Sequence, residues 1–151
     1  MSVPRSERPL RVVQWTTGNI GRRSLHAILA RPDLELAGVF AWGADKVGVD
    51  AADLCGWPEP TGVLATDDPA ALIALRPDAC AYNPLWPALD ELEALLAAGI
   101  NVVTTAGWIN GSKQTPEDRA RIEAACLAGA STIYGSGAHP GITNVVGLVL
   151  S

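Results

Sequence analysis

The sequence has few cysteines, no long apolar run and little positive charge. Its three cysteines, Cys55, Cys80 and Cys126, are odd in number and far apart, with no Cys-x-x-Cys or Cys/His spacing, so we expect no metal site. No apolar stretch reaches the roughly 18 residues of a membrane span, and the first nine residues are too polar for a signal peptide. The net charge of −5 argues against a basic face for nucleic acid. We therefore expect a cytoplasmic protein with neither membrane nor nucleic-acid partners.

Strand-like and helix-like segments alternate along the 151 residues, a length usual for one domain. The patterns predict strands at 10–15, 34–42, 63–65, 79–82, 101–105 and 131–134, and helices at 20–29, 67–76, 87–98, 115–129 and from about 141. A short helical turn is expected near residues 50–53. This alternation is typical of βαβ units. We predict a single α/β domain over residues 1–151, a doubly wound parallel sheet with helices on both faces.

The most informative motif, Trp15-Thr16-Thr17-Gly18-Asn19-Ile20-Gly21, follows the first predicted strand and opens a helix. Gly18 and Gly21 occupy the second and third glycine positions of G-x-G-x-x-G, whereas Thr16 stands in the first. Bare backbone N–H groups at a helix N-terminus suit a pyrophosphate, and two arginines follow directly. The predicted cofactor contacts are Thr16, Thr17, Gly18, Asn19, Ile20, Gly21 and Arg22. The alternative is an ordinary turn followed by two solvated arginines, Arg22 and Arg23.

The end of the second predicted strand bears on the choice of cofactor. An NAD site usually has an acidic residue about 20 residues past the glycine motif, bonded to the ribose hydroxyls. That position falls within Phe40-Ala41-Trp42-Gly43, which contains no acid, and Lys46 follows. We predict Trp42 and Lys46 as cofactor contacts, with Lys46 as the partner of a 2′-phosphate. NADP is favoured and NAD stays open, because Lys46 could also be a solvated loop lysine.

The loops after the fourth, fifth and sixth predicted strands should line one mouth, because ligands of a doubly wound sheet lie at the carboxyl ends of its strands. The predicted contacts from these loops are Asn83, Pro84, Thr104, Thr105 and Ala106. Trp86 and Trp108 are expected either to flank the nicotinamide ring or to pack at a domain interface. His139 is a candidate general acid, although a His before Pro-Gly is more often a turn residue.

On these residues the chain resembles the N-terminal domain of the dihydrodipicolinate reductase family. The similar segments are residues 12–22, 46–51, 102–108 and 135–141. The first and last are similar to a divergent branch that includes 2,4-diaminopentanoate dehydrogenase and native amine dehydrogenases. Thr104-Thr105-Ala106-Gly107-Trp108 is similar to the Gly-Thr-Thr-Gly loop that contacts nicotinamide in the lysine-pathway reductases. The resemblance implies hydride transfer between NAD(P)H and a C=N or C=C bond of an imine-like small molecule.

The resemblance also implies a following α+β domain that binds substrate and builds a homo-oligomer. Residues 142–151 begin an apolar helix and end without a cap, so we expect the chain to be the front part of a longer reductase, inactive alone. The alternative is a C-terminal helix that packs on the sheet of the same chain. Neither the His-His-x-x-x-Lys segment of the lysine-pathway enzymes nor the acid that follows the fifth strand of the amine dehydrogenases has a counterpart in this sequence. The alternative function is a module that binds or senses the dinucleotide without catalysis.

Overall fold

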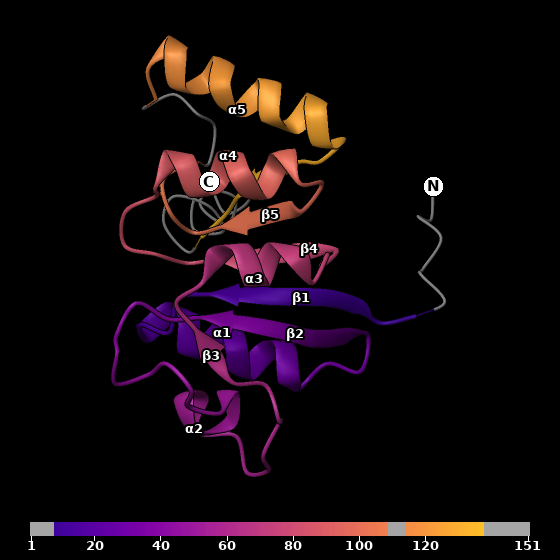
Figure 1. The fold of residues 1–151 in the computed structure, drawn as a ribbon, viewed down its shortest axis with the longest axis vertical. Helices are drawn as coiled ribbons and strands as arrows, with labels where there is room; N and C mark the ends of the chain where they lie inside the picture. The colour runs from indigo at the N-terminus through magenta and orange to yellow at the C-terminus, as the bar shows by residue number, and fades with distance from the viewer. Residues whose placement is uncertain (1–7, 109–113, 138–151) are drawn as a thin grey trace, which may run out of the picture.

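The computed structural model describes residues 8–108 and 114–137, which form one six-stranded parallel sheet in the order β3-β2-β1-β4-β5-β6 (Figure 1). The strands are β1 (Leu10–Trp15), β2 (Leu34–Phe40), β3 (Ala65–Thr66), β4 (Ala79–Tyr82), β5 (Asn101–Thr104) and β6 (Ile133–Gly135). The helices are α1 (Asn19–Leu29), α2 (Ala51–Cys55), α3 (Pro69–Ala74), α4 (Leu89–Ala97) and α5 (Pro116–Gly129). The chain starts in the middle of the sheet, moves outward to β3, crosses to β4 and moves outward again. This confirms the predicted doubly wound α/β fold.

Helix starts agree with the capping residues of the sequence. Asp68 and Thr115 cap α3 and α5, each followed by a proline at the first helical position. Four predicted strands differ in their bounds: β5 ends one residue early, at Thr104, and β6 begins two residues late, at Ile133. β2 ends at Phe40, two residues early, and β3 begins only at Ala65, because Leu64 forms an antiparallel bridge with Asp50 instead. The helix predicted from about residue 141 lies outside the described residues.

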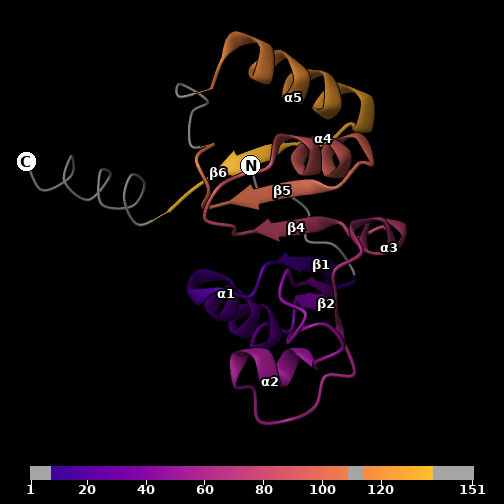
Figure 2. The same ribbon diagram turned by 60° about the vertical axis from the view of Figure 1, so that its left-hand side comes forward.

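The two faces of the sheet are covered by different helices, as the two views show (Figures 1 and 2). Neighbouring residues of β2 point to opposite faces. Val39 belongs to an apolar cluster with Leu25 of α1, whereas Phe40 belongs to a second cluster with Leu72 of α3 and the leucines of α4. None of the helices within the described ranges is both long and apolar enough to cross a membrane.

Candidate functional site

The carboxyl ends of β1, β2 and β4 surround a cavity of about 420 Å³. Its walls come from the turn after β1, the loops after β2 and β4, and the first turn of α4. The lining residues are Thr16, Thr17, Gly18, Trp42, Gly43, Lys46, Asn83, Pro84, Leu85, Trp86, Ala88 and Glu91. The structure therefore brings together residues predicted from three separate sequence segments: 16–18, 42–46 and 83–84.

Thr16 takes the place of the missing first glycine by adopting a glycine-like backbone. Its φ is 73°, in the left-handed region, where a β-branched residue costs on the order of 1–3 kcal/mol. The fully buried side chain of Gln14 supports the turn from below. Its Nε2 lies 3.1 Å from the Trp15 carbonyl oxygen, 3.0 Å from that of Thr16 and 3.0 Å from Asn83 Oδ1. The glycine motif therefore still forms the tight turn, although Thr16 replaces its first glycine.

The two glycines of the turn have different surroundings. A Cβ placed on Gly21 would lie 2.2 Å from the Thr16 carbonyl oxygen, so α1 can pack this closely only with glycine there. A Cβ on Gly18 would meet nothing within 4 Å. Gly18 is also the N-cap of α1, which has no side-chain cap and no acidic residue in its first turn. The first N–H groups and the positive end of the helix dipole are therefore left for an anion.

The loop after β2 brings a ring and a positive charge to the cavity. The Trp42 side chain is 65% exposed, and its ring is nearly perpendicular to that of Phe40, with the ring centroids 4.8 Å apart. The Lys46 N–H donates to the Gly43 carbonyl at 2.8 Å, which folds the loop so that Lys46 also lines the cavity. As far as the structure describes the chain, this loop contributes no carboxylate to the lining. The described part of this loop therefore brings a positive charge, and no negative one, to the cavity wall.

Glu91 is a part of the site that sequence analysis missed. Its Oε2 accepts hydrogen bonds from Trp15 Nε1 at 3.0 Å and from the Tyr82 hydroxyl at 2.7 Å. Burial, with the nearby Glu91 carboxylate adding to it, raises the pKa of the Tyr82 phenol, so Tyr82 remains a donor. An acidic residue in the first turn of a helix ordinarily needs no explanation beyond the helix dipole. The sequence therefore provided no reason to place Glu91 at the cavity rather than only in the first turn of α4.

The loop after β5 follows its strand at the carboxyl edge of the sheet, but its residues do not line this cavity. Thr104 is fully buried and its Oγ1 accepts the Ala106 N–H at 2.9 Å, while Ala106 is itself buried. Trp108, predicted to flank a ligand or a second domain, is buried in the same apolar cluster as Leu92, so that prediction is wrong. Thr105 alone reaches toward the site, accepting a hydrogen bond from Asn83 Nδ2 at 3.2 Å. Because Ala106 and Trp108 are buried in the protein, they do not form part of the cavity wall.

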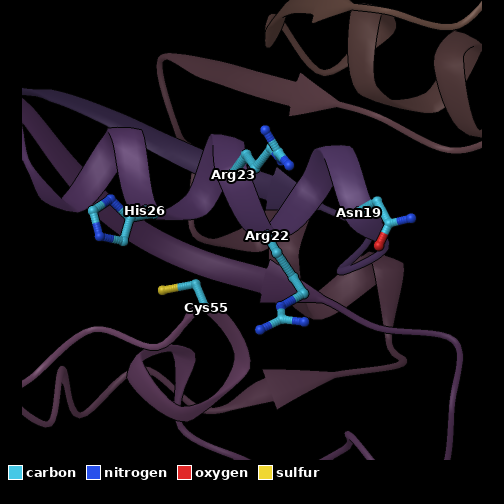
Figure 3. A pocket seen from close by; sticks show the side chains of 5 residues that line it. All are labelled: Asn19, Arg22, Arg23, His26 and Cys55. Atoms are coloured by element: carbon cyan, nitrogen blue, oxygen red, sulfur yellow. The ribbon is translucent and has the colours of Figure 1, made fainter.

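The remaining predicted contacts lie elsewhere on α1. Ile20 is 52% exposed. A second cavity, of about 410 Å³, is lined by Asn19, Arg22, Arg23, His26 and Cys55. In Figure 3 Arg22 extends from α1 toward α2, whereas Arg23 points away from it. Within residues 8–108 and 114–137, no group of three or more His, Cys, Asp or Glu is placed to hold a metal ion. His139 lies outside the described residues.

No protein-family model matches the chain. An amine dehydrogenase from Streptomyces virginiae is 36% identical over 147 residues, covering 92% of this chain and 41% of that protein. The structure of an amine dehydrogenase from Mycobacterium smegmatis superposes with a TM-score of 0.79 at 24% identity, covering 89% of this chain and 41% of that one. The structure of biliverdin reductase from Synechocystis sp. PCC 6803, in complex with biliverdin and NADP+, superposes with a TM-score of 0.67 at 18% sequence identity. The match covers 85% of this chain and 38% of that one.

Other solved structures that share the fold contain NAD or NADH. The chain therefore has the Rossmann-type fold of NAD(P)-binding domains. It spans about two-fifths of the length of the amine dehydrogenases that it matches.

Proposed function

We propose that this chain is the cofactor-binding part of an NADP(H)-dependent oxidoreductase. The observation that carries the proposal is the uncapped N-terminus of α1, which lies behind Gly18 at a cavity at the carboxyl ends of β1 and β4. The sheet order reverses between these two strands, and ligands of open α/β sheets bind at such a switch point. An anionic dinucleotide fits this cavity, because three features meet there: a helix N-terminus without a side-chain cap, the open space in front of Gly18, and the positive charge of Lys46.

The residues present divide the cofactor into parts. Gly18 and the first N–H groups of α1 would hold the pyrophosphate, and Lys46 would pair with the 2′-phosphate of NADP. Asn83 and Thr105, joined by a hydrogen bond, would hold the nicotinamide half on the β4–β5 side. When bound, the dinucleotide supplies the hydride. The work of this chain is to bind and orient it.

For the substrate we propose an imine-like small molecule whose C=N bond, or a C=C bond, accepts the hydride. The support is the amine dehydrogenase relative at 36% identity. The chain spans only part of that relative. We therefore also propose that a separate half binds the substrate, that the protein forms a homo-oligomer, and that His139 is a general acid. We also propose that the chain belongs to the dihydrodipicolinate reductase family, on the segments that resemble it.

Titration of the purified chain with NADPH, and separately with NADH, tests the binding step. Trp42 and Trp86, 65% and 80% exposed, line the cavity, so tryptophan fluorescence should be quenched saturably by the bound cofactor. Half-saturation should occur at a lower concentration of NADPH than of NADH. Replacing both residues by phenylalanine should remove most of the quenching. Trp57, which packs on His26 instead, provides the control, because Trp57→Phe should leave the quenching unchanged. Absence of saturation with both cofactors would overturn the proposal.

A second assay separates an oxidoreductase from a module that only binds the dinucleotide. Because the chain is expected to be inactive without a substrate-binding half, the assay uses the chain joined to such a half, as in the proposed longer reductase. That protein is incubated with NADPH, ammonium and a panel of aldehydes and ketones, and the absorbance of the reduced nicotinamide is followed. Consumption that requires both ammonium and a carbonyl compound supports reduction of a C=N bond. Saturable binding with no consumption for any pair favours the binding module.

A further inference from the structure

Glu91 is the one acidic side chain among the described residues that line the cavity at the ends of β1, β2 and β4. Its two oxygens are in different situations. Oε2 accepts from both Trp15 Nε1 and the Tyr82 hydroxyl, at 3.0 and 2.7 Å. Oε1 accepts no hydrogen bond from any residue that the structure describes. One oxygen therefore fixes the side chain, and the other is left as an acceptor in a cavity wall.

The same cavity presents two exposed aromatic rings, one on each side of β1. Trp42 follows β2 and Trp86 follows β4, and these two strands flank β1 in the sheet. The side chains are 65% and 80% exposed, although large aromatic residues are usually buried. Two such rings at one cavity suit a planar, aromatic ligand group, which can stack on their faces.

The position of the cavity in the sheet identifies the half of the dinucleotide that it fits. The lining comes from both mononucleotide-binding halves of the fold: the turn after β1 and the loop after β2 belong to the first, and the lining residues between 83 and 91 belong to the second. Lys46, proposed above as the partner of the 2′-phosphate on the adenosine ribose, lines the same cavity as Trp42 and Trp86. Thr104, Thr105 and Ala106, at the end of β5, do not line it. The planar group is therefore the purine of the adenosine half rather than the nicotinamide.

We propose that Glu91 selects adenine by accepting a hydrogen bond from its 6-amino group at Oε1, while the ring lies between Trp42 and Trp86. The inference rests on the proposed dinucleotide function and adds to it a residue that determines base specificity. A carboxylate can only accept hydrogen bonds. A 6-oxo purine, such as hypoxanthine, would place its carbonyl oxygen against this acceptor. Two acceptors would then be desolvated without a donor, which disfavours that base.

Comparison of NADPH with its deamino analogue, in which hypoxanthine replaces adenine, tests the proposal directly. The wild-type chain should bind NADPH about tenfold more tightly than deamino-NADPH, the effect of one unsatisfied polar contact. Glu91→Gln should reverse the order. The amide oxygen of the substituted side chain would accept from Trp15 and Tyr82 as Oε2 did, and this turns the amide N–H₂ toward the cavity, where it can donate to a 6-oxo group.

Glu93→Gln is the matched control, because Glu93 pairs with Arg121 of α5 and does not line the cavity. That variant should keep the wild-type ratio of the two dissociation constants. Equal binding of the two cofactors by the wild-type chain overturns the proposal, even if Glu91→Gln fails to fold. An unchanged ratio in a folded Glu91→Gln variant also overturns it while leaving the proposed function standing. Failure of the wild-type chain to bind either cofactor overturns the proposed function itself.

Discussion

Gly21→Ala should destabilise the fold through one contact at the glycine turn. The new Cβ would lie 2.2 Å from the Thr16 carbonyl oxygen, more than 1 Å inside ordinary van der Waals distance, and 2.8 Å from the carbonyl carbon. The turn must then move away from α1. That movement also strains the hydrogen bond from Gln14 Nε2 to the Thr16 carbonyl, which is 3.0 Å long.

Three contributions set the size of the effect. Overpacking costs about 1–3 kcal/mol, and the weakened hydrogen bond adds about 1 kcal/mol. Alanine regains about 1 kcal/mol of helix propensity over glycine. The free energy of unfolding should fall by about 2 kcal/mol, and Tm by roughly 4–8 °C. Urea denaturation followed by circular dichroism measures the first quantity, and a thermal melt measures the second.

Gly18→Ala is the matched substitution, three residues earlier in the same turn. Its Cβ would meet nothing within 4 Å, and a φ of −72° suits any residue, so the free energy of unfolding should change by less than about 1 kcal/mol. The added methyl group would stand before the N-terminus of α1, and the Kd for NADPH should rise at least about tenfold. A Gly21→Ala variant as stable as wild type would refute the packing argument. Unchanged NADPH binding by Gly18→Ala would refute the phosphate position.

Two further predictions concern charged residues of the first half of the fold. Lys46→Ala should weaken NADPH binding and leave NADH binding nearly unchanged, which two fluorescence titrations would show; equal losses would exclude a contact with the 2′-phosphate. Asp50 accepts hydrogen bonds from the N–H groups of Ala52, Thr61 and Gly62, and these bonds, with one from the Thr61 hydroxyl, lower its pKa from 3.8 to about 2. Its stabilising effect is therefore complete above pH 3.8 and lost as the pH falls toward 2. Urea midpoints between pH 4 and 2 should accordingly fall less steeply for Asp50→Asn than for wild type.

Most of the fold was predictable from the sequence because its signals are local. Asp68 before Pro69 and Thr115 before Pro116 start helices by capping and by the fixed φ of proline, and neither effect depends on distant contacts. The sheet topology followed from the alternation of strands and helices. The bounds of β3 did not follow, because the pairing of Leu64 with Asp50 is a contact between residues 14 positions apart that no local pattern encodes.

The site was only partly predictable, because the missing part depends on which side chains the core takes up. Trp108 and Trp86 follow parallel strands and look alike in the sequence. Trp108 is 8% exposed in the core, however, and Trp86 is 80% exposed at the cavity. Glu91 became part of the site through Trp15 and Tyr82, one 76 and the other nine positions away in the sequence. Pairings of this kind are properties of the packed structure and leave no periodicity.

Thr16 is the residue at which the sequence pattern and the structure disagree most usefully, and Thr16→Gly tests what that disagreement costs. Glycine would relieve on the order of 1–3 kcal/mol of strain at a φ of 73° and lose about 1 kcal/mol to chain entropy. No hydrogen bond is lost, because the buried Thr16 Oγ1 has no partner among the described residues. The free energy of unfolding of the variant should therefore rise by about 1 kcal/mol, which a higher urea midpoint would show, and the variant should still bind NADPH. Thr17→Gly, at a buried neighbour without positive φ, should be destabilised instead. If Thr16→Gly is also destabilised, packing of the threonine methyl group outweighs the strain.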